Sequence, residues 1–282
     1  MVETLAERLG YDADSRLVIL CCDDFGTTRS ANDATLQALS FGAATSASLM
    51  VPGPWARDAA ARYRGEDVGV HLALNAEWDT FRWGPITHSP SLLDGIGGFP
   101  KTRDDIWEHA DLDEVAKECR AQIERAIYWG FDVTHLTSHM ATLNLRPDFF
   151  DVLLSLAIEF RLPVRLQSRD VISRQGVPYR QIAEAADVVF PDFVRTSRGR
   201  TAAEVADLIR HAPGGVTELR FHPGLDTAEL RAACDDWEFR VADHLRLNGD
   251  AEIRKALLDV GAITIGWEAL RRLQRGAAVS AS

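Results

Sequence analysis

Five side chains able to do metal or acid–base chemistry stand at or just after the ends of apolar segments. They are Asp23, Asp24, His71, His139 and His222. Two imidazoles and one carboxylate can hold a divalent metal ion and leave positions open for water and substrate. We therefore predict one divalent ion bound by Asp24, His71 and His139. His135 is a rival to His139, because residues 135, 137 and 139 share one face of a strand; His139 is preferred because it lies at the strand end.

Two adjacent carboxylates at the end of a buried strand need a partner, since burying an unpaired charge is costly. A metal ion, a cationic side chain or backbone N–H groups would serve Asp23 and Asp24. The alternative is that one of them caps the next helix and the other is solvated. For each histidine taken alone, the alternative is a hydrogen-bonded core residue. This alternative becomes weaker when several strands each end in a side chain able to bind a metal.

Strand and helix patterns alternate along the chain, which favours a parallel sheet with helical crossovers. The first strand, residues 16–22, is rich in Val, Ile and Leu without polar alternation, so we expect it to be buried on both faces. Ser30 or Asn32 is expected to cap the helix that follows. Further strands are predicted at 44–51, 67–74, 133–138, 163–166, 187–190, 216–221 and 262–267.

An open doubly wound sheet would fit this alternation, but no Gly-rich phosphate loop follows the first strand. We therefore predict an α/β fold with an irregular (β/α) barrel of about seven mostly parallel strands, in one domain covering residues 1–282. The strands of such a barrel all end on one face, where active sites are built. Side chains scattered over roughly 200 positions would meet there.

Residues 75–110 form a Trp-rich insert with little periodicity, predicted to be a long loop or a small lid. Trp83 within it is a candidate for stacking on a sugar ring, and the alternative is a satellite core. Arg165 is a candidate substrate-binding residue. Like Arg220, it could instead pair with acids near the mouth of the barrel or be a surface cation.

The chain has 282 residues, a formal net charge of −11 and no basic cluster, which argues against nucleic acid and anionic membrane surfaces as partners. No apolar run is long enough to span a bilayer, and the acidic N-terminal residues 1–8 are unlike a secretory signal. The four cysteines form no Cys-x-x-Cys pair and indicate free thiols in a reducing cytoplasm. The sequence leaves a homodimer open.

Several motifs follow one another from the first strand to the last. They are Asp-Asp-Phe-Gly at 23–26, Thr-Ser-Ala-Ser-Leu-Met-Val at 45–51, Gly-Val-His-Leu at 69–72, Thr-His at 134–135 with Ser-His-Met at 138–140, and Glu218 with His222-Pro223. Together they resemble the YdjC/ChbG-like carbohydrate deacetylases. The resemblance implies a (β/α) barrel-like fold and a metal-dependent hydrolase that removes an acetyl group from an N-acetylated sugar or a related amide. The substrate would be a small sugar or glycoconjugate.

The resemblance also implies that Asp24, His71 and His139 bind one divalent ion, magnesium or zinc. By analogy with the wider polysaccharide deacetylases, Asp23 would be the base and His222 the acid.

The chain departs from the family at position 137, where Asp is common and Thr137 stands here, and at residues 21–22, where Asn-Ala is common. We expect the loss of a carboxylate at Thr137 to affect the orientation of His139 or the binding of a sugar hydroxyl. Two other functions remain open. One is a catalytically silent carbohydrate-binding protein on the same fold. The other is a non-haem Fe(II) enzyme, although those usually use a jelly-roll-like sheet.

Overall fold

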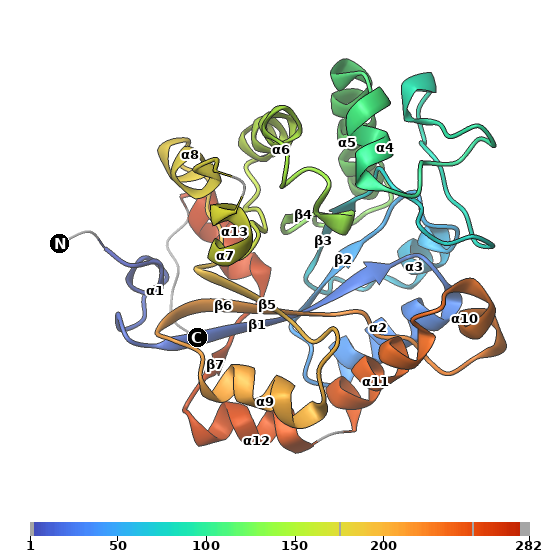
Figure 1. The fold of residues 1–282 in the computed structure, drawn as a ribbon. Helices are drawn as coiled ribbons and strands as arrows, with labels where there is room; N and C mark the ends of the chain where they lie inside the picture. The colour runs from blue at the N-terminus through green and yellow to red at the C-terminus, as the bar shows by residue number, and fades with distance from the viewer. Residues whose placement is uncertain (1–2, 175, 250, 277–282) are drawn as a thin grey trace.

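The computed structural model describes residues 3–174, 176–249 and 251–276. Within these residues a seven-stranded parallel sheet curls into a half-barrel (Figure 1). Its strands follow the order β4-β3-β2-β1-β6-β5, and β7 pairs with the start of β1 beside this path. The strands are β1 (Arg16–Phe25), β2 (Ser46–Leu49), β3 (Val68–Leu72), β4 (Leu136–Ser138), β5 (Phe193–Thr196), β6 (Gly215–Phe221) and β7 (Ile263–Thr264). The predicted α/β architecture with about seven parallel strands is confirmed.

The half-barrel is open in the described part of the chain, because β4 and β5 stand at the two edges of the sheet. The segment 163–166, predicted as a strand, contributes only an isolated bridge between Leu136 and Val164. The predicted strand at 187–190 is wrong. Asp187 has a φ of 54°, and the backbone N–H of Val189 donates to a side chain instead of a neighbouring strand. The strand in this region is β5, a few residues later.

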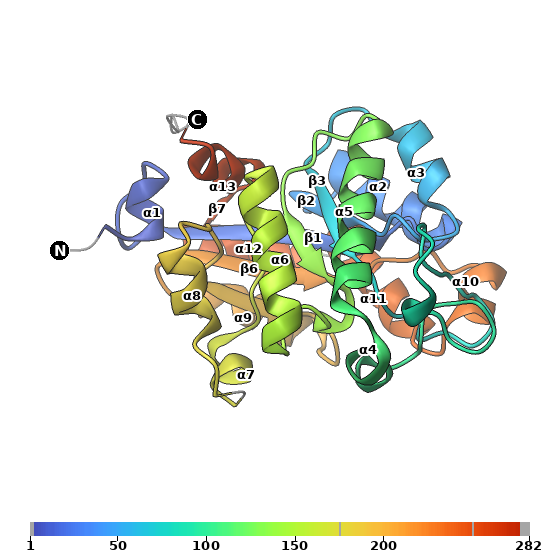
Figure 2. The same ribbon diagram turned by 90° about the horizontal axis from the view of Figure 1, so that it is seen from above.

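Helices cover both faces of the sheet, with α5, α6 and α8 on one side and α2, α9, α11 and α12 on the other (Figures 1 and 2). The helices are α1 (Leu5–Arg8), α2 (Arg29–Ser40), α3 (Ala56–Arg62), α4 (Arg103–His109), α5 (Leu112–Tyr128), α6 (Pro147–Phe160), α7 (Arg169–Ser173), α8 (Tyr179–Ala185), α9 (Ala202–Arg210), α10 (Ala228–Ala233), α11 (Trp237–Asn248), α12 (Ala251–Asp259) and α13 (Trp267–Gln274), with the 3-10 turns η1 (Pro90–Leu92) and η2 (His139–Ala141). No helix in the described ranges is both long and apolar enough to cross a membrane.

The cap of α2 differs from the prediction. Thr28 accepts a hydrogen bond from the backbone N–H of Ala31, whereas Ser30 donates to the carbonyl of Leu225. Asn32 also has another role, because its Oδ1 accepts the backbone N–H of Gly26 at 2.7 Å. The start of α2 therefore holds the turn that follows β1.

The strand β1 is buried on both faces, as predicted. Val18, Leu20 and Cys22 belong to the large core between sheet and helices, and the alternate residues Leu17 and Ile19 belong to a second core that includes Trp267 of α13. Each large apolar side chain buried in this way contributes about 1.5–3 kcal/mol. The two cores make β1 a rigid support for the acids at its end.

The insert at 75–110 lies beyond the carboxyl ends of the central strands, next to α10 (Figures 1 and 2). It contains η1 and α4 and is otherwise irregular. Asn75 fixes its start by donating to the carbonyl of Thr102 at 2.6 Å and accepting from the Thr142 hydroxyl at 2.5 Å. The insert is thereby attached to the turn that carries His139.

Candidate metal centre

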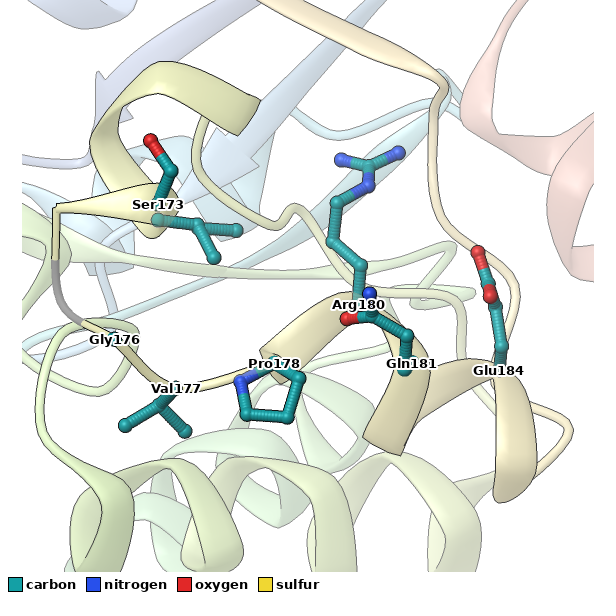
Figure 3. Close-up of a pocket in the computed structure, with 8 residues that line it drawn as sticks. Ser173, Gly176, Val177, Pro178, Arg180, Gln181 and Glu184 are labelled. Carbon is teal, nitrogen blue, oxygen red and sulfur yellow. The ribbon is translucent and has the colours of Figure 1, made fainter.

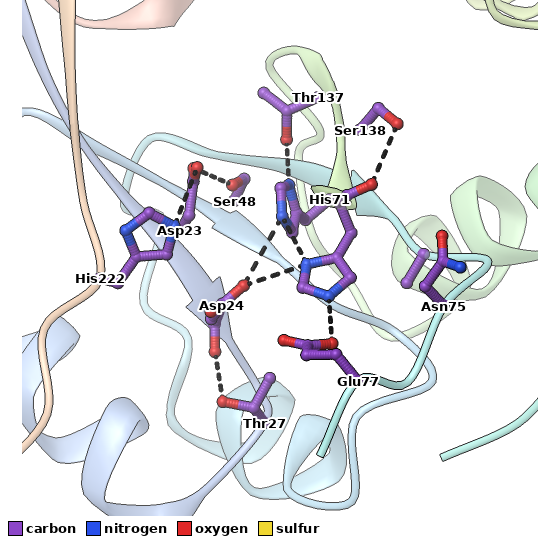
Figure 4. Close-up of polar contacts among 12 residues, drawn as sticks. Asp23, Asp24, Thr27, Ser48, His71, Asn75, Glu77, Thr137, Ser138 and His222 are labelled. Atoms are coloured by element: carbon purple, nitrogen blue, oxygen red, sulfur yellow. Dashed lines mark hydrogen bonds and ion pairs between the residues drawn. The ribbon is translucent and has the colours of Figure 1, made fainter. Parts of the chain in front are cut away.

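The end of β1 presents two consecutive acids to one site, although successive strand residues normally face opposite sides. Positions 22 and 25 of β1 pair with positions 47 and 49 of β2. The interval is three residues in β1 and two in β2, so β1 contains a one-residue β-bulge. Asp24 lies within the bulge and has a φ of 62°, in the left-handed region. Such a conformation costs about 1–3 kcal/mol in a non-glycine residue and is typical of functional sites. Asp23 and Asp24 consequently flank the same centre (Figure 4).

Three side-chain atoms from β1, β3 and η2 form a compact triangle. Asp24 Oδ1 lies 3.6 Å from His71 Nε2 and 3.5 Å from His139 Nδ1, and the two nitrogens are 3.3 Å apart. The ligand atoms of a tetrahedral ion with bonds of about 2.1 Å lie about 3.4 Å apart. The triangle therefore fits one divalent ion, and it is formed by the three residues that the sequence predicted as ligands.

The hydrogen bonds around this triangle leave its inner atoms as acceptors. His139 Nε2 donates to the Glu77 carboxylate at 2.8 Å, so the neutral imidazole carries its lone pair on Nδ1. His71 Nδ1 lies 2.6 Å from the Thr137 hydroxyl, and with the proton assigned to Nδ1 its Nε2 also faces inwards as an acceptor. Asp24 Oδ1 is buried and has no hydrogen-bond partner. Two imidazole nitrogens and an unpaired carboxylate oxygen that converge in this way need positive charge between them, from a metal ion or from a proton.

The electrostatics of the protein alone agree with this requirement. Burial lowers the pKa of His71 to about 3. Burial also lowers the pKa of His139, but the carboxylates of Glu77 and Asp24 outweigh it and raise this pKa to about 10. A proton on His139 is thus favoured where no ion is bound, and metal binding would displace it.

Two residues of this arrangement were missed by sequence analysis. Glu77 lies in the irregular insert, and its only signal is its nearness in sequence to His71. Arg240 on α11 donates from Nη1 to Asp24 Oδ2 at 2.8 Å. It follows Asp24 by more than 200 residues, and no spacing or motif marks it.

The rival ligand His135 does not reach the triangle. Its ring stacks on Trp267 with centroids 4.4 Å apart, and its Nδ1 lies 2.9 Å from the Thr134 hydroxyl. Gly69 makes room for this ring, since a Cβ there would come within 2.4 Å of His135 Nδ1. Thr137, expected to affect His139, instead contacts His71, because β3 and β4 pair these two positions.

Asp23 is held by a buried cation. Its two oxygens accept hydrogen bonds from Arg165 at 2.7 and 2.9 Å and one from Ser48 at 2.8 Å. Glu218 binds the other side of the guanidinium at 2.6 and 2.8 Å and accepts from the indole of Trp267. Burial raises the pKa of Asp23, but Arg165 holds it well below its usual range, so the carboxylate is ionised. Arg165 is only 1% exposed, which argues against the direct substrate contact predicted for it.

His222 and Trp83 occupy different sides of the centre. His222 Nε2 lies 3.9 Å from Asp23 Oδ2, and burial lowers the pKa of this imidazole. Its backbone N–H donates to Asp243 at 2.8 Å, which fixes the strand end that carries it.

Trp83 is 4% exposed and packs edge-on against His139, with its indole N–H bonded to the carbonyl of Asn75. It forms the wall behind His139, as in the predicted satellite-core alternative.

A cavity of about 330 Å³ opens beside the triangle, between the insert and the α10–α11 connection. Its lining includes Glu77, Trp78, Met140, Arg198, Asp235 and Asp236. A different cavity of about 440 Å³ lies between α7 and α8, away from the insert (Figures 1 and 3). Only the first cavity shares a residue, Glu77, with the metal centre.

Comparison with known proteins finds chains of similar sequence and a solved structure of similar fold. A carbohydrate deacetylase of Thermus thermophilus is 36% identical over 95% of this chain and 98% of its own length. One of Geobacillus stearothermophilus is 31% identical over 81% of this chain and 87% of its own. A crystal structure from Enterococcus faecalis V583, described as that of a candidate cellobiose-phosphate cleavage protein, superposes with a TM-score of 0.81 at 24% identity, covering 91% of this chain and 99% of that one, and shares its fold. Residues 17–259 match the model of the YdjC-like protein family, and the chain belongs to that family.

Proposed function

We propose that this protein is a metal-dependent deacetylase that hydrolyses the acetamide of a small N-acetylated sugar or glycoconjugate. The observation that carries the proposal is the unpaired Asp24 Oδ1 facing two imidazole nitrogens within 3.6 Å. Asp23 and His222 lie directly beside this centre. The names of the similar deacetylases support the same reaction class and a carbohydrate substrate.

The residues present supply the parts that amide hydrolysis needs. A divalent ion held by Asp24, His71 and His139 would activate water and polarise the acetyl carbonyl. Asp23, kept ionised by Arg165, accepts the proton that water loses. Because burial lowers the pKa of His222, this imidazole must gain a proton before it can act as an acid. Its Nε2 lies 3.9 Å from Asp23 Oδ2, so it takes up the proton that Asp23 has accepted and delivers it to the leaving nitrogen as the C–N bond breaks. One proton leaves the water and one reaches the amine, so the reaction is balanced.

We place the sugar in the cavity of about 330 Å³ beside Glu77. Its polar lining suits hydroxyl groups, and Trp78 offers an apolar face in the same wall. In this assignment Trp83 and Arg165 support the ligands and the base, and the insert forms one wall of the binding site.

The ligand set narrows the choice of metal. Imidazole nitrogen favours zinc, whereas magnesium prefers oxygen ligands. We propose zinc as the better fit to two histidines, with magnesium as the alternative.

The four cysteines are free and buried, which fits the proposed cytoplasmic location. Sedimentation of the purified protein would distinguish a monomer from a homodimer.

Acetate release from a panel of N-acetylated sugars, together with metal analysis of the purified protein, tests the proposal. We expect one equivalent of metal and acetate release that a chelator stops and added metal restores. Tight sugar binding without acetate release would favour a silent carbohydrate-binding protein. Oxygen consumption with added iron would favour a non-haem Fe(II) enzyme.

A further inference from the structure

Asp24 has two carboxylate oxygens, and the structure gives them different partners. Oδ1 faces the two imidazoles without a hydrogen bond, whereas Oδ2 accepts Nη1 of Arg240 at 2.8 Å. Arginine remains charged at all relevant pH values and forms short, strong hydrogen bonds to carboxylates. The second oxygen of Asp24 is therefore occupied before any ion arrives.

Arg240 is itself held from several sides. It is 2% exposed, its Nε donates to Asp236 at 3.0 Å, and its guanidinium lies 5.0 Å from the ring centre of Trp78. Its backbone carbonyl accepts the N–H of Gly224 at 3.0 Å. A side chain held by Asp24, Asp236 and Trp78 on a fixed backbone cannot easily swing away when a metal binds.

From these contacts we propose that Arg240 is a positioning residue that restricts Asp24 to binding the metal through Oδ1 alone. A carboxylate ligand can bind an ion through one oxygen or through both. With Oδ2 retained by Arg240, Asp24 would occupy one coordination position of a bound ion and leave more positions for water and the acetyl oxygen. By donating to Oδ2, the guanidinium would also weaken Asp24 as an electron donor and leave a bound ion a stronger Lewis acid. This inference rests on the proposed function.

The same residue connects the metal centre to the proposed substrate cavity. Asp236 lines that cavity and binds Arg240 through Oδ1, while its Oδ2 lies 3.2 Å from Arg198 on the rim. A sugar that contacts Asp236 would therefore touch the residue that holds Arg240, and one that contacts Arg198 would touch the ion-pair partner of Asp236. This link provides a physical route by which a correctly seated substrate could secure the ligand geometry.

The test uses Co²⁺, whose visible absorption reports coordination number, added to metal-free protein. We expect Arg240→Gln to bind one equivalent of Co²⁺ with a weaker visible band, because Asp24 then binds through both oxygens. We expect its kcat to fall about 10–100-fold with KM little changed. Arg240→Lys should recover part of the band intensity and of kcat, since an ammonium group can still donate to Oδ2.

Arg271→Gln is the matched control, because Arg271 is a buried arginine paired with Asp132 away from the metal centre. It should lower the melting temperature and leave the Co²⁺ spectrum unchanged. An Arg240→Gln spectrum identical to that of the wild type would overturn the inference, whether or not the variant is less stable. If Arg240→Gln does not fold, Asp236→Asn and Arg240→Lys carry the same comparison. Failure of the wild-type protein to bind Co²⁺ or to release acetate would instead overturn the proposed function.

Discussion

Oε2 of Glu77 lies 2.8 Å from Nε2 of His139, so a residue of the insert fixes the tautomer of a metal ligand. The carboxylate directs the Nδ1 lone pair of His139 towards Asp24 and His71 and makes that nitrogen a stronger donor. The insert therefore contributes to the metal centre itself as well as covering it.

The first prediction follows from this contact. Glu77→Gln removes the negative charge and should lower metal affinity about 10–100-fold, measured by competition with a chelator. Asp79→Asn is the control, because Asp79 lies on the same segment, is exposed and pairs with Lys101. Equal metal affinity in the two variants would contradict the role assigned to Glu77.

The second prediction tests the choice of His139 over His135, which share one face of a strand and which the sequence ranked only by position at the strand end. His139→Gln should reduce bound metal from one equivalent to a small fraction, because it removes one corner of the triangle. His135→Gln should retain the metal and lose stability instead, since His135 packs on Trp267. Metal loss in His135→Gln with full binding in His139→Gln would reverse the ligand assignment.

A third prediction concerns the base. Asp23→Asn should retain the metal and lose at least about 100-fold in kcat, which is the usual scale of general base catalysis. It should also lower the melting temperature, because Arg165 keeps its bonds to Glu218 but loses its charged partner at position 23, and breaking a buried pair is costly. Unchanged turnover in this variant would remove Asp23 from the mechanism.

The fourth prediction uses Asp67, near the opposite end of β3 from His71. Burial raises the pKa of Asp67 from 3.8 to about 6, against hydrogen bonds from Thr134 and the N–H of Glu268. A carboxyl with a raised pKa stabilises the fold fully below pH 3.8, and this stabilisation is lost as the pH rises through 6. On going from pH 8 to pH 5, the free energy of unfolding of the wild type should rise by about 1–2 kcal/mol relative to that of Asp67→Asn.

Urea unfolding of both proteins at the two pH values measures this difference, and comparison with the variant removes the contribution of other groups. A constant difference between wild type and variant would show that Asp67 titrates normally.

The sequence was sufficient to predict the ligands because each follows a strand pattern, and parallel strands end on one side of a sheet. It was insufficient for Glu77 and Arg240, whose roles depend on how the insert and α11 pack and not on periodicity. The strand predicted at 187–190 failed for a local reason: its apolar run resembles β5, but Asp187 turns the chain and Val189 bonds a side chain.

Thr137 shows a second kind of limit. Its position opposite His71 follows from the β3–β4 register, which a single sequence does not fix. Once that register is known, the hydroxyl is a sufficient acceptor for His71, and the carboxylate that His139 needs comes from Glu77.

The bulge at the end of β1 has a consequence for protein engineering. Transplanting Asp-Asp-Phe-Gly onto an ordinary strand of another scaffold would aim one acid at the active face and the other into the helical layer behind it. Deleting a single residue there in the native chain should have the same effect, even with both acids retained. A successful graft must therefore carry over the local backbone path, including the left-handed residue at Asp24.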